Sequence, residues 1–66
     1  MSAYCNLTGE DGNAHAIIGR VARALKEAGV PREEIEDYRA RAMSGSYDDL
    51  LQTSMQVLDD HGIDYD

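Results

Sequence analysis

Glycines divide most of this chain into stretches whose apolar residues recur at helical spacing, and this punctuation restricts the fold more than any other feature. The first stretch runs from about Ala14 to Ala28, where residues three and four positions apart form one apolar stripe. Gly29 suits the left-handed position after a helix, and Val30 can then contact Leu25 as in a Schellman motif. Pro31 prevents simple continuation. The pattern predicts a first helix with a sharp end.

A second helix is predicted to open at Pro31 and to extend to about Met43. It is short and rich in charge, and Gly45 is expected to end it. If this glycine serves the structure alone, it supplies a left-handed backbone conformation. Its narrow apolar line consists of Ile35, Tyr38 and Ala42.

A third helix is predicted to begin after Ser46, because Ser46 and Asp49 have the spacing of a capping box. Gly62 repeats the glycine stop, with Ile63 able to reach Leu58. The helix is clearly two-faced. The apolar face comprises Tyr47, Leu50, Leu51, Ser54, Val57 and Leu58, and the polar face comprises Asp48, Asp49, Gln52, Gln56, Asp59 and Asp60.

The stretch from Ala3 to Thr8 has β-favouring residues in rough alternation and predicts a short strand. A lone strand leaves backbone donors and acceptors without partners. It therefore either packs flat on the helices or pairs with the same strand of a second copy. We expect a single small domain over residues 1–66, of the α+β class but mostly α, with one short N-terminal strand followed by three helices.

A chain of 66 residues buries only about 60% of its unfolded surface, so its core is small. Self-association would add buried surface, and together with the lone strand this predicts a homo-oligomer, a dimer or a multiple of one. The single cysteine, Cys5, cannot close an intrachain disulfide. No apolar run approaches a signal peptide or a membrane span, so a cytoplasmic location without membrane contact is expected.

Charge is abundant and unevenly spread. The chain holds 13 acidic and 6 basic residues, with a net charge of −7 that disfavours nucleic acids as partners. All the positive residues fall between positions 20 and 41, whereas residues 42–66 contain aspartates and no Lys or Arg. One region can therefore be locally basic on an acidic protein.

The polar turn before the first helix is a candidate anion site. Asn13 is the expected N-cap, with Asp11 as the alternative, and Gly12 allows close backbone approach. Free backbone N–H groups, the positive end of the helix dipole and Arg20 one to two turns further on could hold a phosphate or a carboxylate. The alternative is that this turn only caps the helix and that Arg23 pairs with its i+4 neighbour.

Catalytic and metal chemistry have weak support in the residues. Cys5 and His15 could form a nucleophile and a base, but no third orienting group or oxyanion element is evident. The paired aspartates lack the spacing of calcium or zinc ligands. We expect no enzymatic activity, no cofactor and no metal site. Tyr38 and Tyr47 fall on core stripes.

Two runs resemble a widespread family of very small phage and bacterial proteins: Asp11-Gly12-Asn13-Ala14-His15-Ala16-Ile17-Ile18-Gly19 and Met43-Ser44-Gly45-Ser46-Tyr47-Asp48-Asp49-Leu50-Leu51. The family's typical forms are Asp-Gly-Asn-Ala-Phe-Ala-Leu-Met-Gly and Ser-Gly-Asp-Tyr-Asp-His-Leu-Leu. His15 thus replaces an aromatic residue here, and Asp49 replaces a histidine. Some small phage proteins of this kind act as sponges for nucleotide second messengers of bacterial antiviral defence. The resemblance implies the same role, in a host cytoplasm.

Both runs coincide with predicted helix starts. If the two starts lie side by side, for example across an oligomer interface, they form one pocket with donors, a stacking ring and positive charge. The candidate ligand-binding residues are Asp11, Gly12, Asn13, His15, Arg20, Ser46 and Tyr47. The expected ligand is a small anion of the nucleotide class. The alternative function is an acidic interaction module that blocks a basic site on a host protein.

Overall fold

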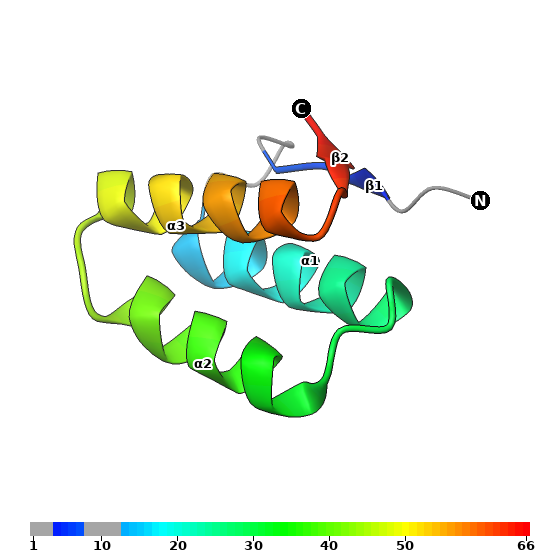
Figure 1. The fold of residues 1–66 in the computed structure, drawn as a ribbon. Coiled ribbons are helices and arrows are strands. Elements are labelled where there is room, and N and C mark those ends of the chain that lie inside the picture. Colours follow the sequence, from blue (N-terminus) through cyan, green and yellow to red (C-terminus); the bar gives the residue numbers. More distant parts are fainter. Residues whose placement is uncertain (1–3, 8–12) are drawn as a thin grey trace.

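The computed structural model describes residues 4–7 and 13–66. In this part of the chain, three helices pack against one another and two short strands lie beside them (Figure 1). The elements in order are β1 (Tyr4–Cys5), α1 (Ala14–Glu27), α2 (Arg32–Met43), α3 (Tyr47–Asp60) and β2 (Asp64–Tyr65). The predicted α+β, mostly helical fold is confirmed.

The ends of α1 and α3 are the glycine stops that the sequence predicts. Gly29 has a φ of +85°, and the amide of Val30 donates to the carbonyl of Leu25 over 3.0 Å. At the end of α3, Gly62 has a φ of +67°, and the amide of Ile63 donates to the Leu58 carbonyl over 2.9 Å. Both predicted Schellman motifs are confirmed.

The helix starts also follow the predicted caps. The side-chain oxygen of Asn13 accepts a hydrogen bond of 2.9 Å from the amide of His15. In the capping box of α3, the amide of Asp49 donates to the Ser46 hydroxyl over 3.3 Å, and the Asp49 carboxylate accepts from the Ser46 amide over 3.2 Å. The second helix starts at Arg32, because Pro31 occupies the N-cap position.

The structural alternative for Gly45, a left-handed backbone conformation, is wrong. Among the described residues, positive φ angles occur only at Gly29 and Gly62. A Cβ atom at position 45 would lie 2.7 Å from a carboxylate oxygen of Asp49 and 2.8 Å from its Cβ. Glycine is required there because the capping carboxylate approaches the backbone closely, not because of backbone conformation.

The core lies between the three helices and is sealed by β1 and by the segment after α3. Its centre contains the fully buried Tyr38, whose hydroxyl shares a 2.6 Å hydrogen bond with the buried hydroxyl of Ser54. The other large side chains with almost no exposure are Leu7, Ile17, Val21, Leu25, Leu50 and Leu58. The predicted apolar face of α3 holds except at its start: Leu51 is half-buried and Tyr47 is exposed.

The N-terminal strand has a partner within its own chain. β1 pairs in parallel with β2, with Tyr4 opposite Asp64 and Cys5 opposite Tyr65. This pairing was not among the two predicted arrangements, so the expectation that the strand has no partner within its own chain is wrong. The hydroxyl of Tyr65 also donates to the Asp59 carboxylate over 3.4 Å, which ties β2 to α3. The rest of the predicted strand, Ala3 and Thr8, lies outside the described residues.

Candidate functional site

A hollow of about 260 Å³ lies where the starts of α1 and α3 meet the end of α2. The two helix starts therefore lie side by side within one chain, without an oligomer interface. Three predicted site residues, His15, Ser46 and Tyr47, line this hollow. The other described residues that line it are Ala14, Ile18, Ala42, Met43, Gly45 and Leu50.

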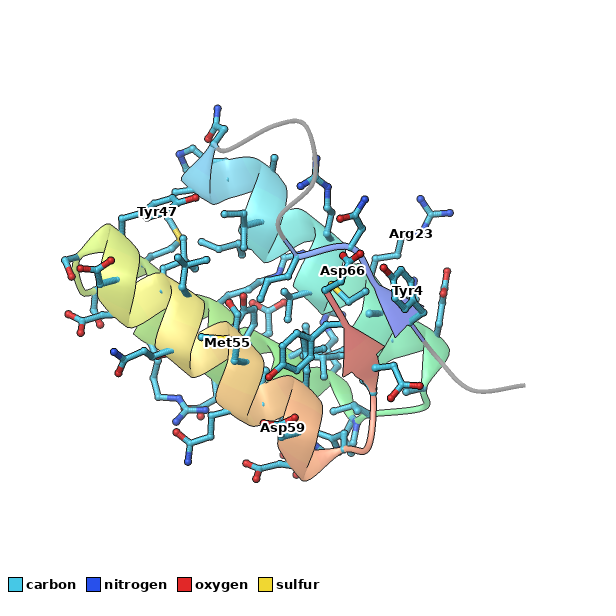
Figure 2. All side chains as sticks on the ribbon, turned by 90° about the horizontal axis from the view of Figure 1, so that it is seen from above. Tyr4, Arg23, Tyr47, Met55, Asp59 and Asp66 are labelled. Atoms are coloured by element: carbon cyan, nitrogen blue, oxygen red, sulfur yellow. The ribbon has the colours of Figure 1, made fainter. Side chains whose placement is uncertain are left out.

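Two large apolar side chains are exposed at the hollow. Tyr47 is 47% exposed and Met43 is 62% exposed. Tyr47 is the first residue of α3, and Figure 2 shows it beside the start of α1. The prediction that Tyr47 packs in the core is wrong, because the apolar stripe of α3 extends past the region that the other helices cover. An exposed ring beside a buried apolar wall can receive a flat ligand group.

The two helix starts differ in charge. The first turn of α1 contains no acidic residue, whereas that of α3 contains Asp48 and Asp49. Carboxylates in a first turn offset the positive end of a helix dipole, so an anion is better accommodated at α1 than at α3. No lysine or arginine is among the described residues that line the hollow.

Arg20 does not line the hollow. Burial raises the pKa of the Cys5 thiol, and Arg20 opposes this shift through its positive charge, so Arg20 lies on the β1 side of α1. The structure therefore does not bring Arg20 to the hollow that His15 and Tyr47 line. At 100° per residue, Arg20 falls 140° from His15 around α1.

The remaining predicted site residues have other positions. Asn13 is not among the residues lining the hollow, and its side chain caps α1. Asp11 and Gly12 lie outside the described residues. The Cys5 thiol is buried, and its raised pKa favours the protonated form, as is typical of a small buried hydrophobe.

A second, larger hollow of about 860 Å³ lies along the seam between α1 and α2. This hollow was not predicted from the sequence. The one sequence signal for it is that all positive charges fall within residues 20–41. Four of its lining residues are the positively charged Arg23, Lys26, Arg32 and Arg39. The predicted i,i+4 pair is present, with Arg23 Nε 3.4 Å from a Glu27 carboxylate oxygen.

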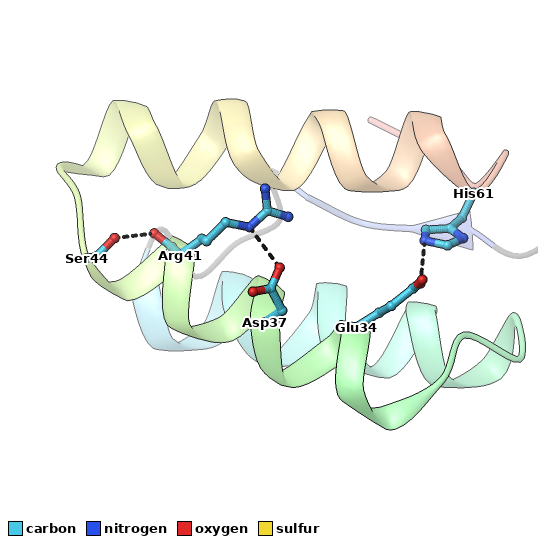
Figure 3. Close-up of polar contacts among 5 residues, drawn as sticks. All are labelled: Glu34, Asp37, Arg41, Ser44 and His61. Atoms are coloured by element: carbon cyan, nitrogen blue, oxygen red, sulfur yellow. Dashed lines mark hydrogen bonds and ion pairs between the residues drawn. The ribbon is translucent and has the colours of Figure 1, made fainter.

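Other charged contacts are structural. Arg41 Nε lies 3.3 Å from the Asp37 carboxylate within α2, and the Ser44 hydroxyl donates to the Arg41 carbonyl over 2.9 Å (Figure 3). His61 Nε2 lies 3.3 Å from the Glu34 carboxylate and connects the end of α3 to the first turn of α2 (Figure 3).

Within the part of the chain that the structure describes, no three or more His, Cys, Asp or Glu side chains form a group that could hold a metal ion. The described helices are also too short or too polar to cross a membrane. No family model matches the chain, and no match was found among curated proteins or solved structures. The functional interpretation therefore depends on the geometry of the two hollows.

Proposed function

We propose that the protein is a non-enzymatic binding protein that sequesters a nucleotide second messenger, such as a cyclic oligonucleotide, at the starts of α1 and α3. The observation that carries this proposal is the hollow lined by His15, Ser46 and Tyr47, which come from two helix starts of one chain. An exposed tyrosine ring beside Met43 is a surface on which a nucleobase stacks. The acid-free start of α1 is the favoured place for a phosphate.

The size of the hollow restricts how such a ligand binds. Its 260 Å³ lies below the roughly 300–1,000 Å³ of typical small-molecule pockets. One base therefore enters the hollow, and the rest of a larger ligand lies across the surface. Sequestration needs no bond to be made or broken, so the bound ligand is released unchanged. In this proposal the protein acts in the cytoplasm, that of the host if it is phage-encoded.

Calorimetric titration with cyclic dinucleotides, cyclic trinucleotides and ADP-ribose derivatives tests the proposal. Tyr47→Ala removes the stacking ring and is expected to weaken binding about tenfold, since base stacking contributes roughly 1–3 kcal/mol. Tyr4→Ala is the matched control, because Tyr4 is also exposed but lies at the other end of the molecule (Figure 2). Arg20→Ala is expected to leave the affinity unchanged. Silence across the panel, or equal losses at Tyr4 and Tyr47, would exclude this site.

A second candidate function is an acidic interaction module that covers a basic site on a host protein. It is favoured by the exposed aspartates of α3 and of the segment after it, a region without Lys or Arg. These residues are Asp48, Asp49, Asp59, Asp60, Asp64 and Asp66. Such binding should weaken steeply as salt is raised, whereas stacking in the hollow should respond less. A salt titration therefore distinguishes the two candidates.

A further inference from the structure

The larger hollow is a groove with regular geometry. α1 lines it with Gly19, Ala22, Arg23 and Lys26, and α2 lines it with Arg32, Ile35, Glu36 and Arg39. Both sets have the spacing i, i+3, i+4, i+7, so each helix presents one face over two turns, and Glu27 at the end of α1 also lines the groove. At a rise of 1.5 Å per residue, the groove extends about 10 Å along the helix pair. Its length matches about two turns of a docked helix.

The groove has an apolar floor and a basic rim. Ala22 and Ile35 are buried in its floor, and Val30 is half-buried at the α1–α2 connection. The rim holds four of the six positive residues of the chain, opposed by two carboxylates: Arg23, Lys26, Arg32 and Arg39 against Glu27 and Glu36. Four positive minus two negative charges give the groove a net charge of +2, on a chain whose net charge is −7.

Gly19 keeps the groove open. A glycine in the middle of a helix lowers the stability of the helix by about 1 kcal/mol relative to alanine. The fold itself does not require this glycine, since its φ is not positive and a Cβ there would meet no atom within 4 Å. Without a side chain at position 19, another backbone can approach α1 closely.

We infer that this groove docks an amphipathic helix of another protein, with an apolar stripe flanked by acidic residues. The stripe would fill the floor, and the acidic flanks would face the rim arginines and lysine, as in other helix-in-groove complexes. Charge complementarity selects this occupant. The lining carboxylates Glu27 and Glu36 and the charge of −7 oppose a nucleic acid more strongly than this helix, because a nucleic acid carries a phosphate charge at every nucleotide.

The described helices of a second copy do not supply the required helix. α3 is the acidic helix of the protein, but its apolar residues Leu50, Val57 and Leu58 are buried in its own core. Docking of α3 would bring aspartates to the rim and leave the apolar floor unfilled. The occupant therefore comes from a different protein.

Fluorescence anisotropy with designed peptides tests the inference on the intact protein. The probe is a helical peptide of about 15 residues with leucines at i, i+3, i+4 and i+7 and glutamates on the flanks. Saturable binding of this probe is expected, with at least tenfold weaker binding of two controls: the peptide with lysines in place of the glutamates, and a scrambled peptide of equal composition. Equal binding of the three peptides, or tighter binding of a short DNA duplex, would overturn the inference.

Two arginines of α2 provide a matched pair of variants. Arg39 lines the groove, whereas Arg41 lies outside its lining and pairs with Asp37. Arg39→Glu should weaken the acidic peptide about tenfold, whereas Arg41→Glu, with the same charge change on the same helix, should leave its affinity unchanged. Gly19→Leu should also block binding, with circular dichroism to verify the fold. Equal effects of the two arginine variants, or undiminished binding to Gly19→Leu, would disprove docking in this groove.

Discussion

At the scale of single residues, the most constrained polar group is the hydroxyl of Tyr38. Its side chain is fully buried, and its hydroxyl shares a 2.6 Å hydrogen bond with Ser54, which is also fully buried. No buried side-chain nitrogen or oxygen among the described residues lacks a hydrogen-bond partner. Each of these two hydroxyls therefore depends on the other.

Removing both hydroxyls should destabilise the fold by less than the sum of the two single removals. Tyr38→Phe leaves the Ser54 hydroxyl buried without its partner, and we expect the free energy of unfolding to fall by about 1–3 kcal/mol. Ser54→Ala should have an effect of similar size. The double variant should lose less than the sum of the single variants, which urea denaturation of all four proteins measures. Simple additivity would mean that the hydrogen bond contributes nothing.

Burial of two ionisable groups makes stability depend on alkaline pH. It raises the pKa of the Cys5 thiol above its ordinary 9.0 and that of the Tyr38 phenol above 10.0. Both groups ionise more readily in the unfolded chain, so their stabilisation is complete below pH 9.0 and is lost as pH rises past these values. Urea midpoints should therefore decline above pH 9.0, and less steeply for Cys5→Ala. An identical decline in that variant would contradict this origin.

At the scale of the elements, glycines have opposite effects according to their position. Gly19→Ala should raise the free energy of unfolding by about 1 kcal/mol, because it removes a mid-helix glycine at an exposed site. Gly29→Ala should lower it by about 1 kcal/mol, because the φ of +85° strains any residue with a Cβ. Thermal unfolding should show a higher melting temperature for Gly19→Ala and a lower one for Gly29→Ala. Equal shifts in the same direction would contradict the assigned backbone roles.

The helices were predictable because their signals are local. Gly29 and Gly62 define helix ends, and Asn13 and Ser46 define helix starts, within a few residues of sequence. The strand pairing was not predictable, because β2 has only two residues and its partner lies at the other end of the chain.

The candidate site was predictable in part for the same reason. His15, Ser46 and Tyr47 share a hollow because each is near a helix start, and the two starts are adjacent in the fold. Arg20 does not line this hollow, because tertiary packing determines which side of α1 faces β1. The α1–α2 groove depends on how two helices are aligned, and helix propensity carries no information about this alignment.

At the scale of the whole molecule, the question is whether a single chain folds stably without a second copy. β1 finds its backbone hydrogen-bond partner in β2 of the same chain, so it does not need a second copy. The small size of the core is now the only argument for the predicted homo-oligomer. We still expect self-association at high micromolar concentration, with light scattering as the measurement. The mass of a single chain throughout would remove this prediction. The proposed nucleotide hollow would be unaffected, because one chain forms it.

The parallel pairing also has a mechanical consequence. In a parallel pair, the chain enters one strand and leaves the other at opposite ends of the ladder. A force that pulls Tyr4 and Tyr65 apart therefore loads the backbone hydrogen bonds in shear, all at once, rather than peeling them one by one. The hydrogen bonds between β1 and β2 must therefore break before a force on these two residues can separate the helices.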